Sequence, residues 1–267
     1  MIKVKFGMKN FYTNVLKHNK YAVYQAKAEL KSEIANSYLS WVWWVLDPLF
    51  YMLIYTFVVV VVFGNSQRAF PVFVFIGLCA WDLFSRIVQG SVKTVKNNIG
   101  IINKVYIPKY IFLISKSFVF LFKFMISLSL ILILMLIFKV PITLQILNFP
   151  IILVTLYLVA FGMGTILLHF GVFVEDLANV IGIVFRFLFY FSGIFYDINE
   201  RIPKPFSTIM ITLNPIATII HQFRKCFFYG VCPDYILLFT WSLAGFVLSV
   251  LGVFLIHKYE DSYAKIA

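Results

Sequence analysis

The sequence predicts an all-α integral membrane protein with six transmembrane helices. Three observations lead to this prediction. The 267 residues are 62% hydrophobic and only 13% charged, the mean hydropathy is +0.93, and apolar runs long enough to cross a bilayer recur along the chain. One soluble core cannot bury that much apolar surface. Because no polar stretch of domain size interrupts the runs, residues 1–267 are expected to form a single membrane domain.

The six runs account for most of the chain. About twenty apolar residues cross the hydrocarbon core of a bilayer. Runs of about that length lie at residues 41–63, 70–88, 111–138, 151–174, 177–196 and 235–256. With the N-terminus inside, fourteen basic residues fall in cytoplasmic segments and six in outer segments. This bias predicts that both termini are cytoplasmic.

Two polar segments are more than connectors. Residues 14–36, within a cytoplasmic interfacial segment at 1–40, combine an apolar stripe with a basic face at helical spacing, which predicts an amphipathic helix along the membrane surface. The stripe comprises Tyr21, Tyr24, Leu30 and Ile34, and the basic face comprises Lys17, Lys20, Lys27 and Lys31. In the segment 197–230, apolar patches at 206–213 and 216–228 are each too short to span. Asn214-Pro215 separates them, so they predict two short extracytoplasmic helices between spans five and six.

Charged residues inside the apolar runs are candidates for function, because they are costly in lipid. Asp47-Pro48 predicts a helix break that places Asp47 in headgroup water, and a direct role in gating or substrate contact is the alternative. Asp82 and Arg86 have the spacing of an ion pair within one helix, which would stabilise the second span.

Two further cations lie in later runs. Lys123 is deep in the third run, where it could snorkel, pair with a carboxylate, or contact an anionic substrate. Arg186 in the fifth run has similar alternatives, and the nearness of Asp176 in sequence favours a structural role. Both stay candidates for a substrate path.

Aromatic side chains in two of the runs are candidates for lining a passage. They are Trp44, Tyr51 and Tyr55 in the first run, and Phe187, Tyr190, Phe191 and Tyr196 in the fifth. Such rings can offer flat faces to sugar rings and hydroxyls to their polar edges. Because 19% of the chain is aromatic, simple packing is the alternative for the same residues.

Sequence motifs for catalysis or nucleotide binding are missing. No GxxxxGK[ST] loop occurs, so any energy from ATP must come from a partner. The four histidines and three cysteines form no catalytic or metal-ligand constellation. Cys226 and Cys232 could form a disulfide if their loop is extracytoplasmic. The basic residues are spread by topology rather than gathered into a groove-sized patch, which argues against nucleic acid as a partner.

Four stretches in order along the chain resemble ABC-2 type permeases that export polysaccharides and teichoic acids. The run SYLSWVWWVLDPL at 37–49 is similar to the SxLGxxWxxLxPL opening of those permeases. Gly77-Leu78 with Trp81 and Phe84 resembles GLxxWxxF, and NNIGIINKVYIP at 97–108 resembles NxxLIxKVYFP. The last stretch, FSGIFY at 191–196 followed by Asn214-Pro215 and Arg224, resembles FLSPIFY…NP…R.

The chain departs from the family pattern at three places. Ser40 replaces the usual Gly, and Gly193 replaces the usual Pro, and both changes should alter helix flexibility. Glu33-Ile34 stands where an Arg-Tyr pair is common, which puts a basic headgroup contact there in doubt.

The resemblance implies a homodimer in the bacterial cytoplasmic (inner) membrane, driven by two cytoplasmic ABC ATPase subunits. ATP and Mg²⁺ would bind to those subunits, and this chain would bind no cofactor. Residues 93–110 would hold the coupling segment, with Lys104, Tyr106 and Pro108 as contacts and Glu175-Asp176 as a second contact. A positive-inside anchor is the alternative for that segment.

The cargo implied by the resemblance is a lipid-linked glycan or a polyol-phosphate polymer, moved through a channel between two copies of the chain. Export of a small hydrophobic drug or lipid is the alternative within transport. A membrane-bound glycosyl or acyl transferase is the alternative from another class. That enzyme would need carboxylate or histidine constellations at the membrane face, and none is visible in the sequence.

Overall fold

The computed structural model describes residues 8–35, 40–64, 68–260 and 262–263, which form helices and turns without a strand. The longer helices are α1 (Met8–Ala35), α2 (Ser40–Thr56) with a π-helical continuation η1 (Phe57–Val62), α3 (Phe70–Val92), α6 (Lys109–Ile137), α7 (Phe149–Phe173), α8 (Leu177–Phe191), α11 (Pro215–Phe227) and α12 (Tyr235–Lys258). The shorter ones are α4 (Thr94–Asn97), α5 (Ile99–Ile102), η2 (Leu144–Asn148), α9 (Ile198–Arg201) and α10 (Phe206–Leu213). The prediction of an all-helical protein is confirmed.

Within the described residues, five helical stretches are long and apolar enough to cross a membrane. They are Trp41–Val62, Phe70–Val92, Lys109–Ile137, Leu144–Phe173 and Tyr235–Lys258. Each coincides with a run that the sequence predicts, so the chain is a multi-pass membrane protein. The remaining run is the shorter apolar helix α8.

Helix α8 is shorter than the sequence predicts. The apolar run continues to residue 196, but the helix ends at Phe191. Gly193 has φ = 66°, a left-handed conformation that ends helices and turns the chain away. At 1.5 Å per residue, α8 is about 22 Å long, against about 30 Å for a hydrocarbon core.

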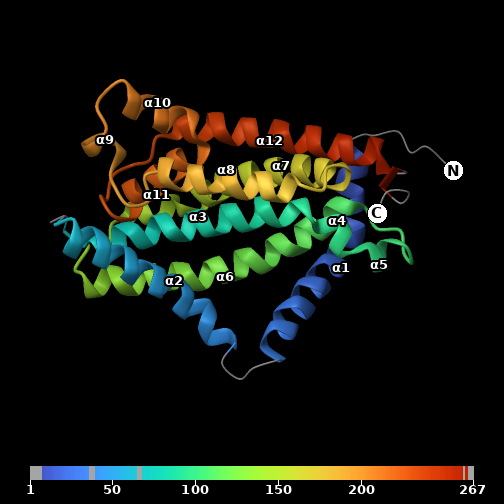
Figure 1. Ribbon diagram of the computed structural model, residues 1–267, viewed down its shortest axis with the longest axis horizontal. Coiled ribbons are helices and arrows are strands. Elements are labelled where there is room, and N and C mark those ends of the chain that lie inside the picture. Colours follow the sequence, from blue (N-terminus) through green and yellow to red (C-terminus); the bar gives the residue numbers. More distant parts are fainter. Residues whose placement is uncertain (1–7, 36–39, 65–67, 261, 264–267) are drawn as a thin grey trace.

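The lengthwise helices lie side by side, and the two ends of the molecule differ (Figure 1). Helices α4 and α5 lie at the end where α1 begins and α12 finishes. Helices α9 and α10 lie at the opposite end. The segments with the cytoplasmic and extracytoplasmic assignments from sequence are therefore separated by the full length of the bundle.

Helix α3 is the centre of the core, because 78% of the residues in its apolar 18-residue stretch are buried. It packs against α2, α6, α7, α8 and α11. Beside it, α7 and α12 form the closest helix pair. A Cβ on Gly245 of α12 would lie 2.7 Å from backbone atoms of Leu158 and Val159, so only glycine permits this approach.

Helix α1 forms where the sequence predicts it, but only part of the predicted apolar stripe is packed: the Tyr21 ring lies 6.1 Å from that of Phe112, between centroids. Ala22 and Ala26 are buried, whereas Tyr24 from the predicted apolar stripe is 74% exposed. The Ser115 hydroxyl on α6 donates a hydrogen bond to the Ala22 carbonyl at 2.9 Å. Small side chains let the backbone of α1 approach α6 this closely, whereas an aromatic stripe would hold it away.

The predicted break at Asp47-Pro48 is wrong. Helix α2 continues through Pro48 to Thr56. A proline removes one backbone donor from a helix, and a membrane helix tolerates that loss where neighbouring groups satisfy the carbonyl. Asp47 consequently stays on a continuous helix.

The two short helices before α12 are confirmed as α10 and α11. Asn214 lies between them, and its side-chain oxygen accepts hydrogen bonds from the backbone N–H groups of Ile216 and Ala217, which caps α11. The disulfide alternative is not realised in the structure, because Cys226 is a buried free thiol and Cys232 an exposed one.

Candidate functional site

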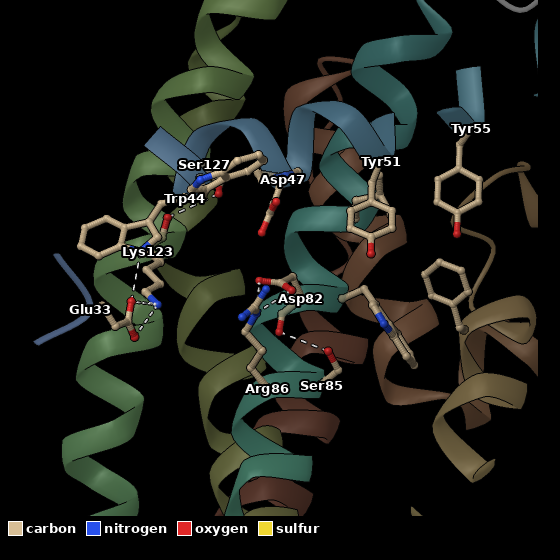
Figure 2. A pocket seen from close by; sticks show the side chains of 15 residues that line it. Glu33, Trp44, Asp47, Tyr51, Tyr55, Asp82, Ser85, Arg86, Lys123 and Ser127 are labelled. Carbon is tan, nitrogen blue, oxygen red and sulfur yellow. Dashed lines mark hydrogen bonds and ion pairs between the residues drawn. The ribbon is translucent and has the colours of Figure 1, made fainter. Parts of the chain in front are cut away.

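A pocket of about 610 Å³ lies where α2 crosses the middle of α3 and α6 (Figure 2). We call it the Asp47 pocket. Its polar lining comprises Glu33, Asp47, Asp82, Ser85, Arg86, Lys123 and Ser127, and its other side chains are Trp43, Trp44, Pro48, Tyr51, Tyr55, Leu78, Trp81 and Phe189. Figure 2 shows Asp47 directed from α2 toward the Asp82–Arg86 pair on α3.

Lys123, the middle residue of α6, is paired with a carboxylate. Its Nζ lies 2.6 Å from Glu33 Oε2 and 5.2 Å from the centre of the Trp44 ring. The Trp44 indole N–H donates to the same carboxylate oxygen at 3.1 Å. Among the alternatives for Lys123, a neighbouring carboxylate is therefore the one observed. Its partner lies 90 positions away in the chain, at the end of α1.

The predicted ion pair on α3 is confirmed. Arg86 Nε lies 2.7 Å from each carboxylate oxygen of Asp82, and both side chains are about half exposed. Asp47 differs from the other two carboxylates of the pocket, because among the described residues it has no ion pair or hydrogen bond. Asp47 is exposed on an unbroken helix, and its direct role in gating or substrate contact stays a prediction.

A second pocket, of about 460 Å³, continues from the first along α2 and η1. We call it the Tyr196 pocket, and its lining comprises Tyr55, Val58, Val59, Phe63, Tyr190, Phe195, Tyr196 and Arg201. Tyr55 lines both pockets. Its ring lies 4.3 Å from the ring of Phe195 and 6.0 Å from that of Phe189, measured between centroids. The two pockets are thus divided by a small aromatic cluster.

The aromatic candidates fall into two groups. Trp44, Tyr51 and Tyr55 line the Asp47 pocket, and Tyr190 and Tyr196 join Tyr55 in the Tyr196 pocket. Phe187, Phe191 and Arg186 line neither pocket. They are exposed on α8, and Arg186 forms no ion pair with Asp176 or with any other described residue.

Sequence reasoning missed several lining residues, among them Glu33, Trp81 and Phe189. Glu33 reaches the Asp47 pocket from α1, and its place beside Lys123 has no local sequence signal. Trp81 and Phe189 face each other at 5.3 Å between ring centroids. The family-like motif around Trp81 and the aromatic cluster around Phe189 were the available signals.

The segment 93–110 lies at the end of the bundle where α12 finishes. Tyr106 is 66% exposed, and its hydroxyl donates to Glu260 Oε2 at 3.0 Å. The other oxygen of Glu260 accepts from Lys109 Nζ at 2.8 Å in a pair that is almost fully buried. An exposed ring is thus held through its hydroxyl by the turn after α12.

The other coupling candidates differ in exposure. Lys104, Glu175 and Asp176 are exposed, but Pro108 is buried, so it does not share a surface knob with Tyr106. Lys96 Nζ lies 3.8 Å from Glu175 Oε1, which brings the turn between α7 and α8 beside α4. The two stretches singled out in the sequence therefore adjoin each other.

The chain is similar to proteins of a known family. The profile of ABC-2 type transporters matches residues 24–228, more than half of its length. The chain belongs to the ABC-2 type transporter family. Two O-antigen export system permease proteins (RfbA) of Klebsiella pneumoniae are each 26% identical to it, over 89% of this chain and 91% of theirs. A protein of the same name from Myxococcus xanthus is 25% identical over 77% of this chain and 79% of its own length.

Two of the ABC-2-like stretches, the second and the last, meet at Arg224, on α11. Its Nη1 and Nη2 donate to the carbonyls of Gly193 at 2.6 Å and Ile194 at 2.7 Å, and Nε donates to the carbonyl of Phe73 at 3.2 Å. A Cβ on Gly77 would lie 2.9 Å from Nη2. In this ABC-2 chain the motif residues therefore fix the end of α8 against α3. Residues 37–39 of the first stretch lie outside the described residues.

The electrostatics at Arg224 are those of a buried cation without a carboxylate in contact. Burial lowers the pKa of its guanidinium below the ordinary value, while Tyr229 and Asp197 act to raise it. The ordinary pKa of arginine is so high that the group stays charged at neutral pH. Its positive charge is balanced by three carbonyl dipoles and by the face of the Phe73 ring. The centroid of that ring lies 3.4 Å from Arg224 Cζ.

Proposed function

We propose that this chain is the transmembrane subunit of an ATP-driven exporter that moves a lipid-linked polysaccharide outward across a bacterial cytoplasmic membrane. Membership of the ABC-2 type transporter family supports a transport role. The names of the O-antigen export relatives support a polysaccharide as cargo. The observation that carries the proposal is the pair of aromatic-lined pockets along α2, which share Tyr55 and would be joined into one passage if that ring moved aside.

In this proposal α8 is the sixth span, and both termini are cytoplasmic. The end with α4, α5 and the start of α1 carries the basic segments and would face the cytoplasm (Figure 1). Helices α9, α10 and α11 would then be extracytoplasmic, and α1 would lie along the cytoplasmic surface. A short span is tolerated where the bilayer thins or where protein surrounds the helix.

Two copies of the chain would complete the passage. Helix α2 exposes Phe50, Leu53 and Ile54, and α8 exposes Ile183 and Phe187. These apolar faces flank the two pockets, since Tyr51 and Tyr55 come from α2 and Tyr190 from α8. Association through the faces would bury apolar surface and close the open side of the path. Arg186 would lie within that interface or at its edge.

Energy would come from two cytoplasmic ABC ATPase subunits that bind ATP and Mg²⁺. The adjoining segments 93–110 and 175–176 form a surface with exposed residues of both signs, including Lys104 and Glu175. Tyr106 stands out from this surface as an aromatic contact suited to a partner groove. Movement of an ATPase subunit would reach α6 through Lys109 and α12 through Glu260.

The test is a triple substitution, Tyr51→Ala, Tyr55→Ala and Tyr190→Ala, in the native host with the partner ATPase present. Because each ring contributes about 0.5–1.5 kcal/mol of contact energy, surface polymer is expected to fall on the order of tenfold. The matched control is Phe239→Ala on α12, which removes an equally exposed ring outside both pockets. Surface polymer is measured with specific lectins or antibodies, at equal membrane levels of the variants.

Two results would count against the proposal. An unchanged amount of surface polymer in the triple variant would mean that these three rings are not needed for export. Failure of any ABC ATPase to co-purify with the wild-type chain would remove the energy source and with it the export function.

A further inference from the structure

The Asp47 pocket has an unequal balance of charge. Its carboxylates are Glu33, Asp47 and Asp82, and its cations are Arg86 and Lys123. Each cation already touches a carboxylate, at 2.7 Å for Arg86 and 2.6 Å for Lys123. Asp47 is left over, so one pocket carries a formal charge of −1.

This balance is unfavourable for a chain of phosphodiesters. A phosphate in the pocket would have to displace Asp82 from Arg86 or Glu33 from Lys123, which leaves a carboxylate without its partner. Otherwise it would approach Asp47 without compensation. Like charges repel each other, and two copies of the chain would present two such pockets.

The same lining suits an uncharged sugar chain. Trp44, Tyr51 and Trp81 provide ring faces on which the apolar face of a pyranose can stack. Asp47 offers two acceptor oxygens to sugar hydroxyls without any competing ion pair, and the Ser85 and Ser127 hydroxyls lie in the same lining. Stacking and hydroxyl recognition both operate without charge on the ligand.

The other pocket does not reverse this preference. Its single charged lining residue is Arg201, which is exposed and follows the exposed Glu200 in the chain. Arg201 lines the Tyr196 pocket and not the Asp47 pocket, so it adds no positive charge to the lining around Asp47.

We infer that the exported polymer is an uncharged glycan whose backbone has no phosphodiester links, and that Asp47 contacts its hydroxyls. This inference rests on the proposed function and decides between the two polymer classes, glycan and polyol phosphate. A phosphate on the lipid carrier at one end of the chain is compatible with it, because that group need not pass the pocket.

The first test is Asp47→Asn, which keeps the shape and removes the charge. If the polymer is uncharged, loss of a charged acceptor weakens the hydroxyl contact, and surface polymer should fall about two- to fivefold. If the polymer is a polyanion, loss of repulsion should raise export. Surface polymer at equal membrane level is the readout, and an unchanged or increased amount overturns the inference.

The second test identifies the polymer and does not depend on a folded variant. The gene is deleted in its host, and the surface polymer that is lost is purified and assayed for phosphorus and uronic acid per repeat unit. A polymer without either in its repeats supports the inference, and a phosphodiester or a carboxylate in every repeat overturns it while leaving the export function intact. Loss of no polymer at all would instead overturn the export function and the inference together.

Discussion

Helices α3 and α2 are both apolar and both long enough to span, yet their surroundings are opposite. In α3, 78% of the residues in an apolar 18-residue stretch are buried, whereas in α2 with η1 the corresponding share is 6%. Helix α8 resembles α2, since it buries only Phe185. Hydropathy therefore identifies helices that avoid water but cannot tell which ones have protein neighbours. We call α7, α12 and the parts of α3 and α6 packed against them the packed side. The open side comprises α2, η1, α8 and the part of α3 that lines the Asp47 pocket with Asp82 and Arg86.

The distribution of charges follows the same division. On the packed side, Lys109 and Glu260 pair with little exposure, at 7% and 12%. On the open side, Asp82 and Arg86 pair in the pocket with about half of each side chain exposed. The packed pair joins the start of α6 to the turn after α12, whereas the half-exposed pair stays accessible in the Asp47 pocket.

The largest expected effect comes from Glu260→Gln. It leaves the Lys109 ammonium buried without a counter-charge, which should cost about 3–5 kcal/mol in the free energy of unfolding. The matched change on the open side is Asp82→Asn, where water replaces the lost partner and the cost should be about 0–1 kcal/mol. Thermal unfolding of the purified protein in one detergent compares them. Equal losses would break the distinction between the two sides.

A smaller loss is expected from Arg224→Lys. A lysine can reach only part of the carbonyl set that the guanidinium satisfies, and losing hydrogen bonds to a buried charge should cost about 2–4 kcal/mol. Arg201→Lys on exposed α9 is the control, with no expected change. Unfolding midpoints and limited proteolysis between α8 and α9 are the measurements. A protected junction in the Arg224 variant would mean that Arg224 does not hold α8 in place.

A pair of glycine substitutions gives the smallest effects. A Cβ on Gly171 of α7 would lie 2.1 Å from the carbonyl oxygen of Val92, so Gly171→Ala should destabilise the protein by about 1–3 kcal/mol through overpacking. Gly182 on α8 has no atom within 4 Å of such a Cβ. Gly182→Ala should therefore be neutral or slightly stabilising through helix propensity, by up to about 1 kcal/mol. Thermal unfolding of both variants is the measurement. A stabilising Gly171→Ala together with a destabilising Gly182→Ala would contradict the assignment of α7 and α8 to different sides.

The sequence predicted the elements far better than their contacts. Apolar runs near twenty residues sufficed for five spans, and Asn214-Pro215 marked the boundary of α10 and α11. The Asp82–Arg86 pair was predictable because its geometry is fixed within one helix turn. The end of α8 was missed because Gly193 interrupts an apolar run without changing its hydropathy.

The candidate site was only half predictable for the same reason. Trp44, Tyr51 and Tyr55 share a helix, so their spacing was visible. The partner of Lys123 was not, because Glu33 comes from a helix 90 positions earlier. Pro108 was misjudged because burial depends on how α6 begins against its neighbours, which no local pattern encodes.

The π-helical segment η1 contains more residues per turn than the α-helix that precedes it. A π-turn holds one residue more than an α-turn, and η1 lies where Val58 and Val59 border the Tyr196 pocket. Tightening one such turn to α geometry would rotate the residues beyond it by about 100° and would carry Phe63 to another side of the helix. Such a change would replace the side chains that the span presents to the Tyr196 pocket while the segment stays helical. A change of pocket lining would then need neither a hinge nor local unfolding of α2.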